Sequence, residues 1–249
     1  MTYPDTARQE YLYTSRREMA DHVFPIADHL GLPLSDAAIE QQRLVAGCVA
    51  LIDYMWDNDP ASHAPFLQYC QELESIGTEA QPPQMVHPQV AEDLNALMDS
   101  MDPLKIPTFF AMGRTAVSLA GKYKATTNPA HFMHLRAHEA RCSGHMMTSA
   151  MPRQDRDHSA YPRYAELVGE IMVARNAADT LRDLRSDYRT GETQLRPTAL
   201  NRGVVAVIAA RDIGRCCAML GPRLSATMLG VTFAHSQARR RIKPHGNEK

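Results

Sequence analysis

The sequence predicts an all-α protein, a single-domain helical bundle around a deep apolar cavity. Apolar residues recur at the three- and four-residue spacing of helices through most of the chain, and no convincing run alternates with the period of a half-buried strand. Proline and glycine fall mostly between the helical segments. Apolar residues make up 44% of the 249 residues, which is enough for a substantial core. A helical bundle of this size can enclose a deep apolar pocket.

The helices are predicted in order along the chain. The first covers 7–30. The second covers 36–56, where a wide apolar stripe faces the core and Ser35 precedes the first turn as its N-cap. The others are predicted over 61–76, 88–101, 105–123, 130–150, 161–189, 198–220 and 223–241.

The charge of the chain is balanced, which restricts the class of partner. Lysine and arginine number 27 and aspartate and glutamate 28, so the formal net charge is −1. This balance argues against nucleic acid or an anionic membrane surface as a partner. Basic residues form a run only from Arg239 to Lys243, and we expect a flexible, solvated tail there, over 239–249. One domain is therefore expected across 1–249.

Cysteine usage and the lack of targeting signals indicate a reducing compartment. The five cysteines have no paired spacing, which predicts reduced thiols. The first residues form neither a basic nor an apolar signal region, and no apolar stretch approaches the ~20 residues that a membrane span needs. We expect a cytoplasmic protein without stable membrane insertion. Whether it forms a homodimer is left open.

A first acidic pair lies at the end of the second predicted helix. Asp53 and Asp57 are four residues apart, so both project from one face. Like charges at this spacing cost stability unless a cation lies between them, and Mg²⁺ prefers such oxygen ligands together with substrate phosphates. The pair therefore predicts an Mg²⁺ site; the alternative is a solvated helix end.

A second acidic patch lies in the predicted helix over 161–189. Asp179, Asp183 and Asp187 recur every four residues along one face. Arg182 and Arg185 flank them, so a surface salt-bridge helix is an alternative. We expect the three acids to repel one another rather than to be neutralised. If the two patches face each other across the bundle, they could hold Mg²⁺ ions around a diphosphate.

The second patch resembles the second Asp-rich motif of squalene and phytoene synthases. The matching residues are Arg182, Asp183, Asp187, Gly191, Leu195 and Pro197. Asp53 and Asp57 resemble the first DxxxD motif of the same family. The resemblance implies the all-α fold of class I isoprenoid synthases. It also implies Mg²⁺ bound by Asp53, Asp57, Asp183 and Asp187, with Asp179 as a further ligand.

A third segment, 134–144, resembles the kinked helix of bacterial terpene cyclases, the cyclase branch of the same superfamily. In that branch an arginine senses the diphosphate, and a break in the helix directs a carbonyl dipole at the carbocation. The resemblance implies Arg136 as the sensor, with Arg141 as runner-up. The cyclase NSE pattern is met by Asn176 and Thr180 but not at its third place, where Leu184 stands.

Together these motifs predict a terpene synthase, a lyase that ionises an allylic prenyl diphosphate and cyclises or rearranges the carbocation. Arg136 and Arg182 would act in catalysis and, with Arg185, bind the diphosphate. Two alternatives are kept: a head-to-head prenyl transferase of the squalene or phytoene synthase type, and a helical interaction domain without enzymatic activity.

Two further groups of residues have alternative interpretations. Three of the four histidines His131, His134, His138 and His145 could form a zinc site, although no HExxH motif or cysteine partner supports one. Seven aromatic residues lie near the motifs and are expected either to line the cavity or to pack in the core. They are Tyr54, Trp56, Phe109, Phe110, Phe132, Tyr164 and Phe233.

Overall fold

The structure is a computed structural model that describes residues 13–14, 17–18, 20–58, 61, 63–76 and 88–242. For a few of these, including Asp57 and 227–242, only the backbone is described. Every regular element in this part of the chain is helical, which confirms the all-α prediction. None of the helices within these ranges has the length and apolar character needed to cross a bilayer.

The α-helices follow the predicted segments closely. After a short 3₁₀ turn, η1 (Asp21–Val23), the bundle is built from nine α-helices within the described ranges. They are α2 (Phe24–Leu30), α3 (Asp36–Asn58), α4 (His63–Ile76), α5 (Pro88–Ser100), α6 (Ile106–Ala125), α7 (Pro129–Ser149), α8 (Arg153–Arg156), α9 (Tyr161–Thr190) and α10 (Ala199–Ile242), with a second 3₁₀ turn, η4 (Pro103–Lys105), before α6.

One predicted helix is divided. The sequence predicted one continuous helix up to residue 30. In the structure a 3₁₀ turn, η1, interrupts this helix before α2, so the prediction is wrong over its last ten residues. Pro25 stands in the first turn of α2 and has no N–H to donate to the preceding turn, so the α-helix begins anew there.

Sequence-local signals explain where other helices begin and end. The Ser35 hydroxyl accepts a hydrogen bond from the N–H of Ala38 at 3.2 Å, which is the predicted N-cap of α3. The break predicted between 220 and 223 is present inside α10, where Gly221 has φ 75° and ψ 169° and is followed by Pro222. The basic run from Arg239 begins within the last backbone turns of α10, and 243–249 lie outside the described residues.

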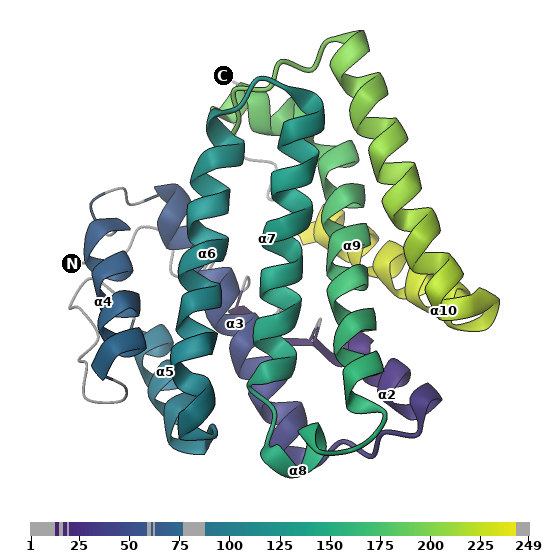
Figure 1. The fold of residues 1–249 in the computed structure, drawn as a ribbon. Coiled ribbons are helices and arrows are strands. Elements are labelled where there is room, and N and C mark those ends of the chain that lie inside the picture. Colours follow the sequence, from purple (N-terminus) through teal and green to yellow (C-terminus); the bar gives the residue numbers. More distant parts are fainter. Residues whose placement is uncertain are drawn as a thin grey trace.

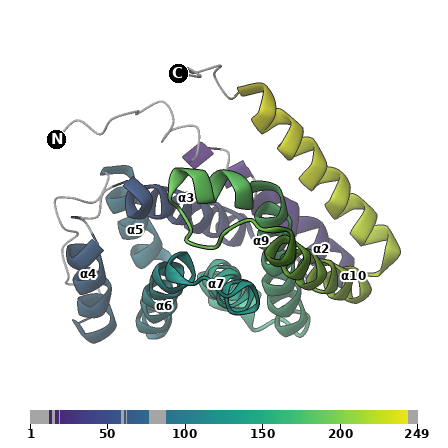
Figure 2. The same cartoon turned by 90° about the horizontal axis from the view of Figure 1, so that it is seen from above.

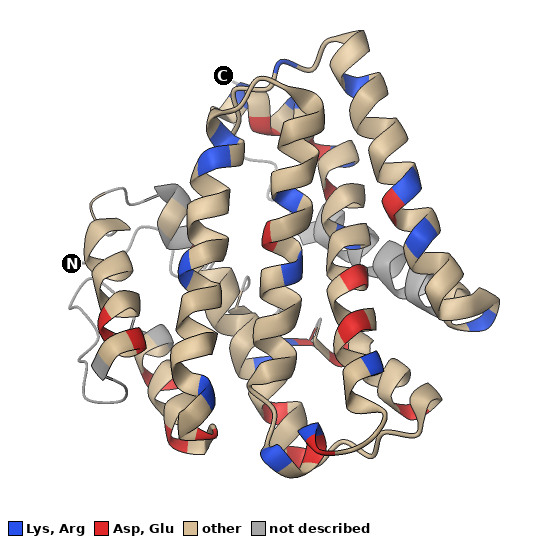
Figure 3. Ribbon diagram, in the orientation of Figure 1, with Lys and Arg blue, Asp and Glu red and all other residues tan. Residues whose placement is uncertain are grey.

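The long helices form a row with α3 across it (Figure 1). Helix α7 packs against both α6 and α9, and α9 packs against α10. Figure 2, seen from above, shows α3 and α5 on one side of this row, with α4 beside α6. Acidic and basic residues are distributed over most helices rather than gathered by sign (Figure 3), as the balanced net charge predicts.

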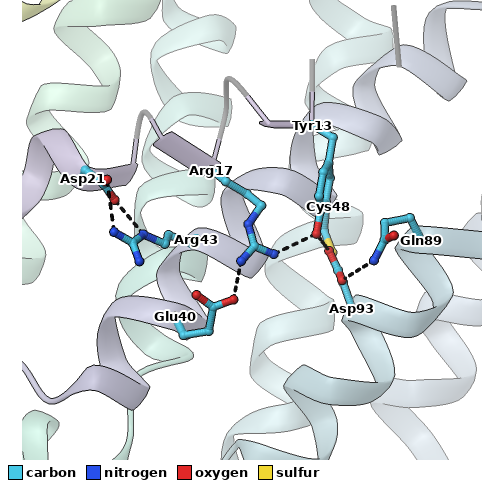
Figure 4. Close-up of polar contacts among 8 residues, drawn as sticks. All are labelled: Tyr13, Arg17, Asp21, Glu40, Arg43, Cys48, Gln89 and Asp93. Carbon is cyan, nitrogen blue, oxygen red and sulfur yellow. Dashed lines mark hydrogen bonds and ion pairs between the residues drawn. The ribbon is translucent and has the colours of Figure 1, made fainter. Parts of the chain in front are cut away.

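A buried polar network fastens the N-terminal segment to α3 and α5 (Figure 4). The Tyr13 hydroxyl donates to the buried Asp93 carboxylate, and Arg17 donates to the Tyr13 oxygen at 2.8 Å and to Glu40. The Tyr13 ring lies so close to Gly47 that a Cβ there would stand 2.6 Å from a ring carbon. The same two helices contribute to the wall of an apolar cavity, Cys48 from α3 and Leu94 from α5.

Candidate functional site

A polar pocket of about 200 Å³ lies where α3, α6, α7 and α9 meet. Asp53 contributes from α3, and Asp179, Asp183 and Asp187 contribute from α9. Asp53 of the first acidic patch therefore faces the same pocket as the second patch, although 126 residues separate it from Asp179. The three acids of α9 also share one face of the helix, as their spacing predicts. Asp57 lies in the last turn of α3, and its side chain is outside the described residues.

Cationic side chains line the same pocket. Arg136 reaches it from α7, Arg182 from α9 and Lys124 from the last turn of α6. The segment after α9 is held against α6 by a backbone hydrogen bond from Gln194 N–H to the Lys124 carbonyl at 3.0 Å. This bond places Glu192 beside Lys124 in the pocket wall.

Arg182 pairs with two of the three acids of α9. Its guanidinium lies 2.8 Å from Asp179 and 2.6 Å from Asp183, and its Nε also donates to both oxygens of Asp183 at 2.9 and 3.1 Å. This hydrogen bonding with Asp183 raises the pKa of Arg182. The expectation that the acids of α9 repel without being neutralised was therefore wrong for Asp179 and Asp183, because Arg182 lies one residue before Asp183 and folds back onto both.

Asp187 is half-buried and has both acidic and basic side chains around it. Burial, together with the charges of Glu192 and Asp183, raises the pKa of Asp187 to about 6. Arg136 and Arg182 act in the opposite direction but do not cancel the shift. A carboxyl in such surroundings favours the approach of a cation.

Arg136 is held rigidly at the inner side of the pocket. Its guanidinium stacks on Tyr123 and Phe132, with centroid distances of 5.0 and 5.7 Å, and its Nε donates to the Asn176 side chain at 2.7 Å. The same Asn176 amide donates to Glu139 at 2.9 Å. Asn176 therefore links α7 to α9 and fixes the orientation of the Arg136 fork toward the pocket.

Glu139 lies one turn beyond Arg136 and faces Asp53. Burial and the Asp53 charge raise the pKa of Glu139 to about 7. Arg136 and hydrogen bonds from Ser143 and Asn176 lower it only in part. The site therefore holds a carboxyl that is half protonated near neutral pH.

Glu139→Gln is expected to stabilise the protein at high pH. A carboxyl pKa raised on folding favours the folded state below about pH 4.5, and this stability is lost as the pH rises toward 7. The variant should be more stable by on the order of 2 kcal/mol at pH 8 and by little near pH 4.5, measured by urea unfolding. The exposed, ion-paired Glu166 provides the control Glu166→Gln, which should not show this pH dependence. An equal effect of Glu139→Gln at both pH values would contradict the assignment.

A further pocket, the vestibule, shares wall residues with the polar pocket and with two apolar cavities. The vestibule, about 120 Å³, shares Asp53, Arg136 and Asp179 with the polar pocket. Val49 and Ser143 line the vestibule and also both apolar cavities. An acidic, arginine-lined pocket and two apolar cavities therefore share the walls of one vestibule.

The first apolar space, the α6 cavity, lies between α3, α4, α5, α6 and α7 and has a volume of about 70 Å³. Phe109, Phe110 and Trp56 line it, as predicted for three of the aromatic residues, and Trp56 stacks on His63 at 3.7 Å. The second, the α10 cavity, is about 120 Å³ and lies between α3, α7, α9 and α10, with Met172 and Cys216 in its wall. Phe132 and Tyr164 instead pack in the core, and the side chains of Tyr54 and Phe233 are outside the described residues.

The expected break in α7 is not present. Helix α7 is continuous from Pro129 to Ser149. Gly144, the residue best suited to break it, is required for another reason: a Cβ there would lie 2.9 Å from the Cα of Gly169 in α9. The glycine permits close approach of the two helices rather than a kink.

Several predicted residues lie elsewhere. Arg185 is exposed and does not line the polar pocket. Arg141 forms an ion pair with the buried Glu170 at 3.0 Å, so it joins α7 to α9 away from the pocket. Thr180 is buried and donates to the Asn176 carbonyl at 2.8 Å. Among the residues described, no group of three or more histidine, cysteine or acidic side chains is arranged to hold a metal ion, so neither the zinc alternative nor a preformed magnesium cluster is supported.

Sequence reasoning missed Lys124 and Glu139. Glu139 carried a detectable signal, since it follows Arg136 by three residues and so shares its helical face. Lys124 had only its position in the last turn of a predicted helix, which is common for a lysine.

Comparison of the sequence with protein-family models and with curated proteins, and of the fold with solved structures, gave no match.

Proposed function

We propose that this protein is a Mg²⁺-dependent terpene synthase, which ionises an allylic prenyl diphosphate and cyclises or rearranges the carbocation. The observation that carries the proposal is the polar pocket that opens onto apolar space. It joins Asp53 of α3 to the acids of α9, contains Arg136, Arg182 and Lys124, and leads through a shared vestibule into the two apolar cavities. We assign the polar part to the diphosphate and the apolar part to the isoprenoid chain.

The donor set of the pocket suits Mg²⁺. Its acidic side chains offer only oxygen ligands, and burial together with the charges of Glu192 and Asp183 raises the pKa of Asp187. Mg²⁺ is usually held by one or two carboxylates together with substrate phosphates and water, so a preformed group of three ligands is not required. Asp53, Asp183 and Asp187 would hold the ions, with Asp179 as a further ligand. The ions would supply Lewis-acid stabilisation of the leaving diphosphate.

The protein's own residues would bind and neutralise the diphosphate. Arg136 is oriented by stacking and by Asn176 before substrate arrives, so its fork meets phosphate oxygens without reorganisation. Arg182 of α9 and Lys124 of α6 add positive charge in the same pocket. The apolar cavity excludes water and folds the chain, and the faces of Phe109, Phe110 and Trp56 would stabilise positive charge on it.

One observation favours a second candidate, a head-to-head prenyl transferase. The vestibule leads to two apolar cavities, and a condensing enzyme must place two isoprenoid chains on one polar site. Both isoprenoid chains would share the polar pocket of about 200 Å³. The choice between the two candidate enzymes therefore depends on whether this pocket can admit a second diphosphate.

The test is diphosphate release from C10, C15 and C20 allylic diphosphates, with Mg²⁺ and with EDTA in its place. We expect release with Mg²⁺ and loss of release with EDTA. The mass of the hydrocarbon product distinguishes the two candidates, since only the condensing enzyme doubles the number of carbons. Lack of release from any of the substrates in Mg²⁺ would refute both and favour an interaction domain.

A further inference from the structure

Helix α6 lines the route from the polar pocket to the floor of the α6 cavity. Tyr123 and Lys124 lie in the polar pocket, and Ala120, Ala116 and Gly113 follow at intervals of one turn in the cavity wall. Phe109 and Phe110 stand at the far end. At 1.5 Å per residue, the distance along α6 from Phe110 to Tyr123 is roughly 20 Å.

Between Ala120 and the floor, the side chains that α6 adds to this wall are no larger than that of Val117. Gly113 is the last position before the two phenylalanines and has no side chain at all. A glycine within a helix costs roughly 0.5–1 kcal/mol relative to alanine, so the open space at this position is obtained at some expense of stability.

A side chain could be placed at Gly113 without disturbing the backbone. An added Cβ would lie 3.3 Å from Cε and 3.8 Å from Sδ of Met146, which are the mobile end of a flexible side chain that itself lines the cavity. The position therefore tolerates alanine, and a longer side chain would extend into the cavity just above its floor.

We infer that Gly113 determines the length of the isoprenoid chain that the α6 cavity accepts. This inference rests on the proposed function, since it assigns the cavity to the chain of a prenyl diphosphate. A leucine at this position raises the effective floor by about one helical turn and excludes the end of the longest chain that the native cavity holds. Excluding even one methylene from an apolar pocket lowers affinity by roughly 10-fold to 200-fold.

The test measures binding, so that it does not depend on turnover. Trp56 is the only tryptophan of the chain and lines the same cavity, so its fluorescence reports occupancy. The probes are the unreactive thiolodiphosphate analogues of the C10, C15 and C20 substrates in Mg²⁺. For Gly113→Leu, the affinity for the longest chain that the native protein binds should fall at least about tenfold relative to the C10 analogue.

The matched control is Gly121→Leu. Gly121 lies on the same helix, is exposed and has no atom within 4 Å of an added Cβ, so this variant should keep the native preference. If Gly113→Leu does not fold, Gly113→Ala decides, with a smaller shift in the same direction expected. An unchanged preference in whichever folded Gly113 variant is measured would overturn the inference while leaving the proposed function intact. A native protein that binds none of the analogues would overturn the proposed function, and this inference with it.

Discussion

Asp183→Asn is expected to lower diphosphate release by about a thousandfold or more. Asp183 lies in the polar pocket opposite Asp53 and is the acid that the pocket brings closest to Arg182. An amide is a poor ligand for Mg²⁺, and losing several kcal/mol of charge stabilisation in the transition state corresponds to this factor at about 1.4 kcal/mol per decade. Turnover is measured as released diphosphate under saturating Mg²⁺.

The fold should survive this substitution. Asn keeps the shape of Asp183, and the partly exposed pair with Arg182 contributes at most about 1 kcal/mol. Circular dichroism and thermal unfolding should therefore stay close to wild type. The control is Asp157→Asn, which removes an exposed ion pair with Arg153 far from the pocket and should leave turnover unchanged. Normal activity in Asp183→Asn would move the reaction to a different site.

Arg182→Lys is expected to lower turnover about tenfold or more. The structure shows Arg182 using both Nε and a terminal nitrogen on Asp183 while also contacting Asp179, a pattern that a lysine ammonium cannot reproduce. The fork also suits phosphate oxygens, so its loss should weaken diphosphate binding in the transition state, at about 1.4 kcal/mol per decade.

A matched arginine on the same helix makes this test specific. Arg185→Lys changes an exposed residue outside the pocket and should be kinetically silent. If Arg182→Lys also shows near-normal kinetics, Arg182 serves only to pair with the acids of α9. The acidic pocket and Arg136 would then have to support the proposal without it.

The sequence predicts the helices well because their signals are local. The N-cap at Ser35 and the break at Gly221 and Pro222 depend on residues within one turn, and both are present. The alignment of Asp179, Asp183 and Asp187 depends only on helical spacing. That Asp53 faces them was a hypothesis about tertiary packing, and the structure places all four in one pocket.

What sequence reasoning missed depends on contacts between helices. The pKa of Glu139 is set by burial and by Asp53, which is 86 residues away in the chain. The continuity of α7 depends on the backbone of α9 behind Gly144, so a glycine that suggests a break proves to serve packing. Arg185 was expected to bind the diphosphate, yet it does not line the polar pocket, although it is only three residues from Arg182.

The contact between Gly144 and Gly169 has a consequence for how the site can move. Since the two backbones touch there, α7 and α9 form a single stiff wall that carries Arg136 on one helix and the acids on the other. Their relative positions are thereby fixed before any ligand arrives. Motion that narrows the mouth would then come from the other helices that line the pocket, among them α3 with Asp53. Helices α7 and α9 should therefore stay fixed relative to each other while α3 moves. Spin labels on α3 and α9 should draw together on ligand binding, and a pair on α7 and α9 should keep its distance.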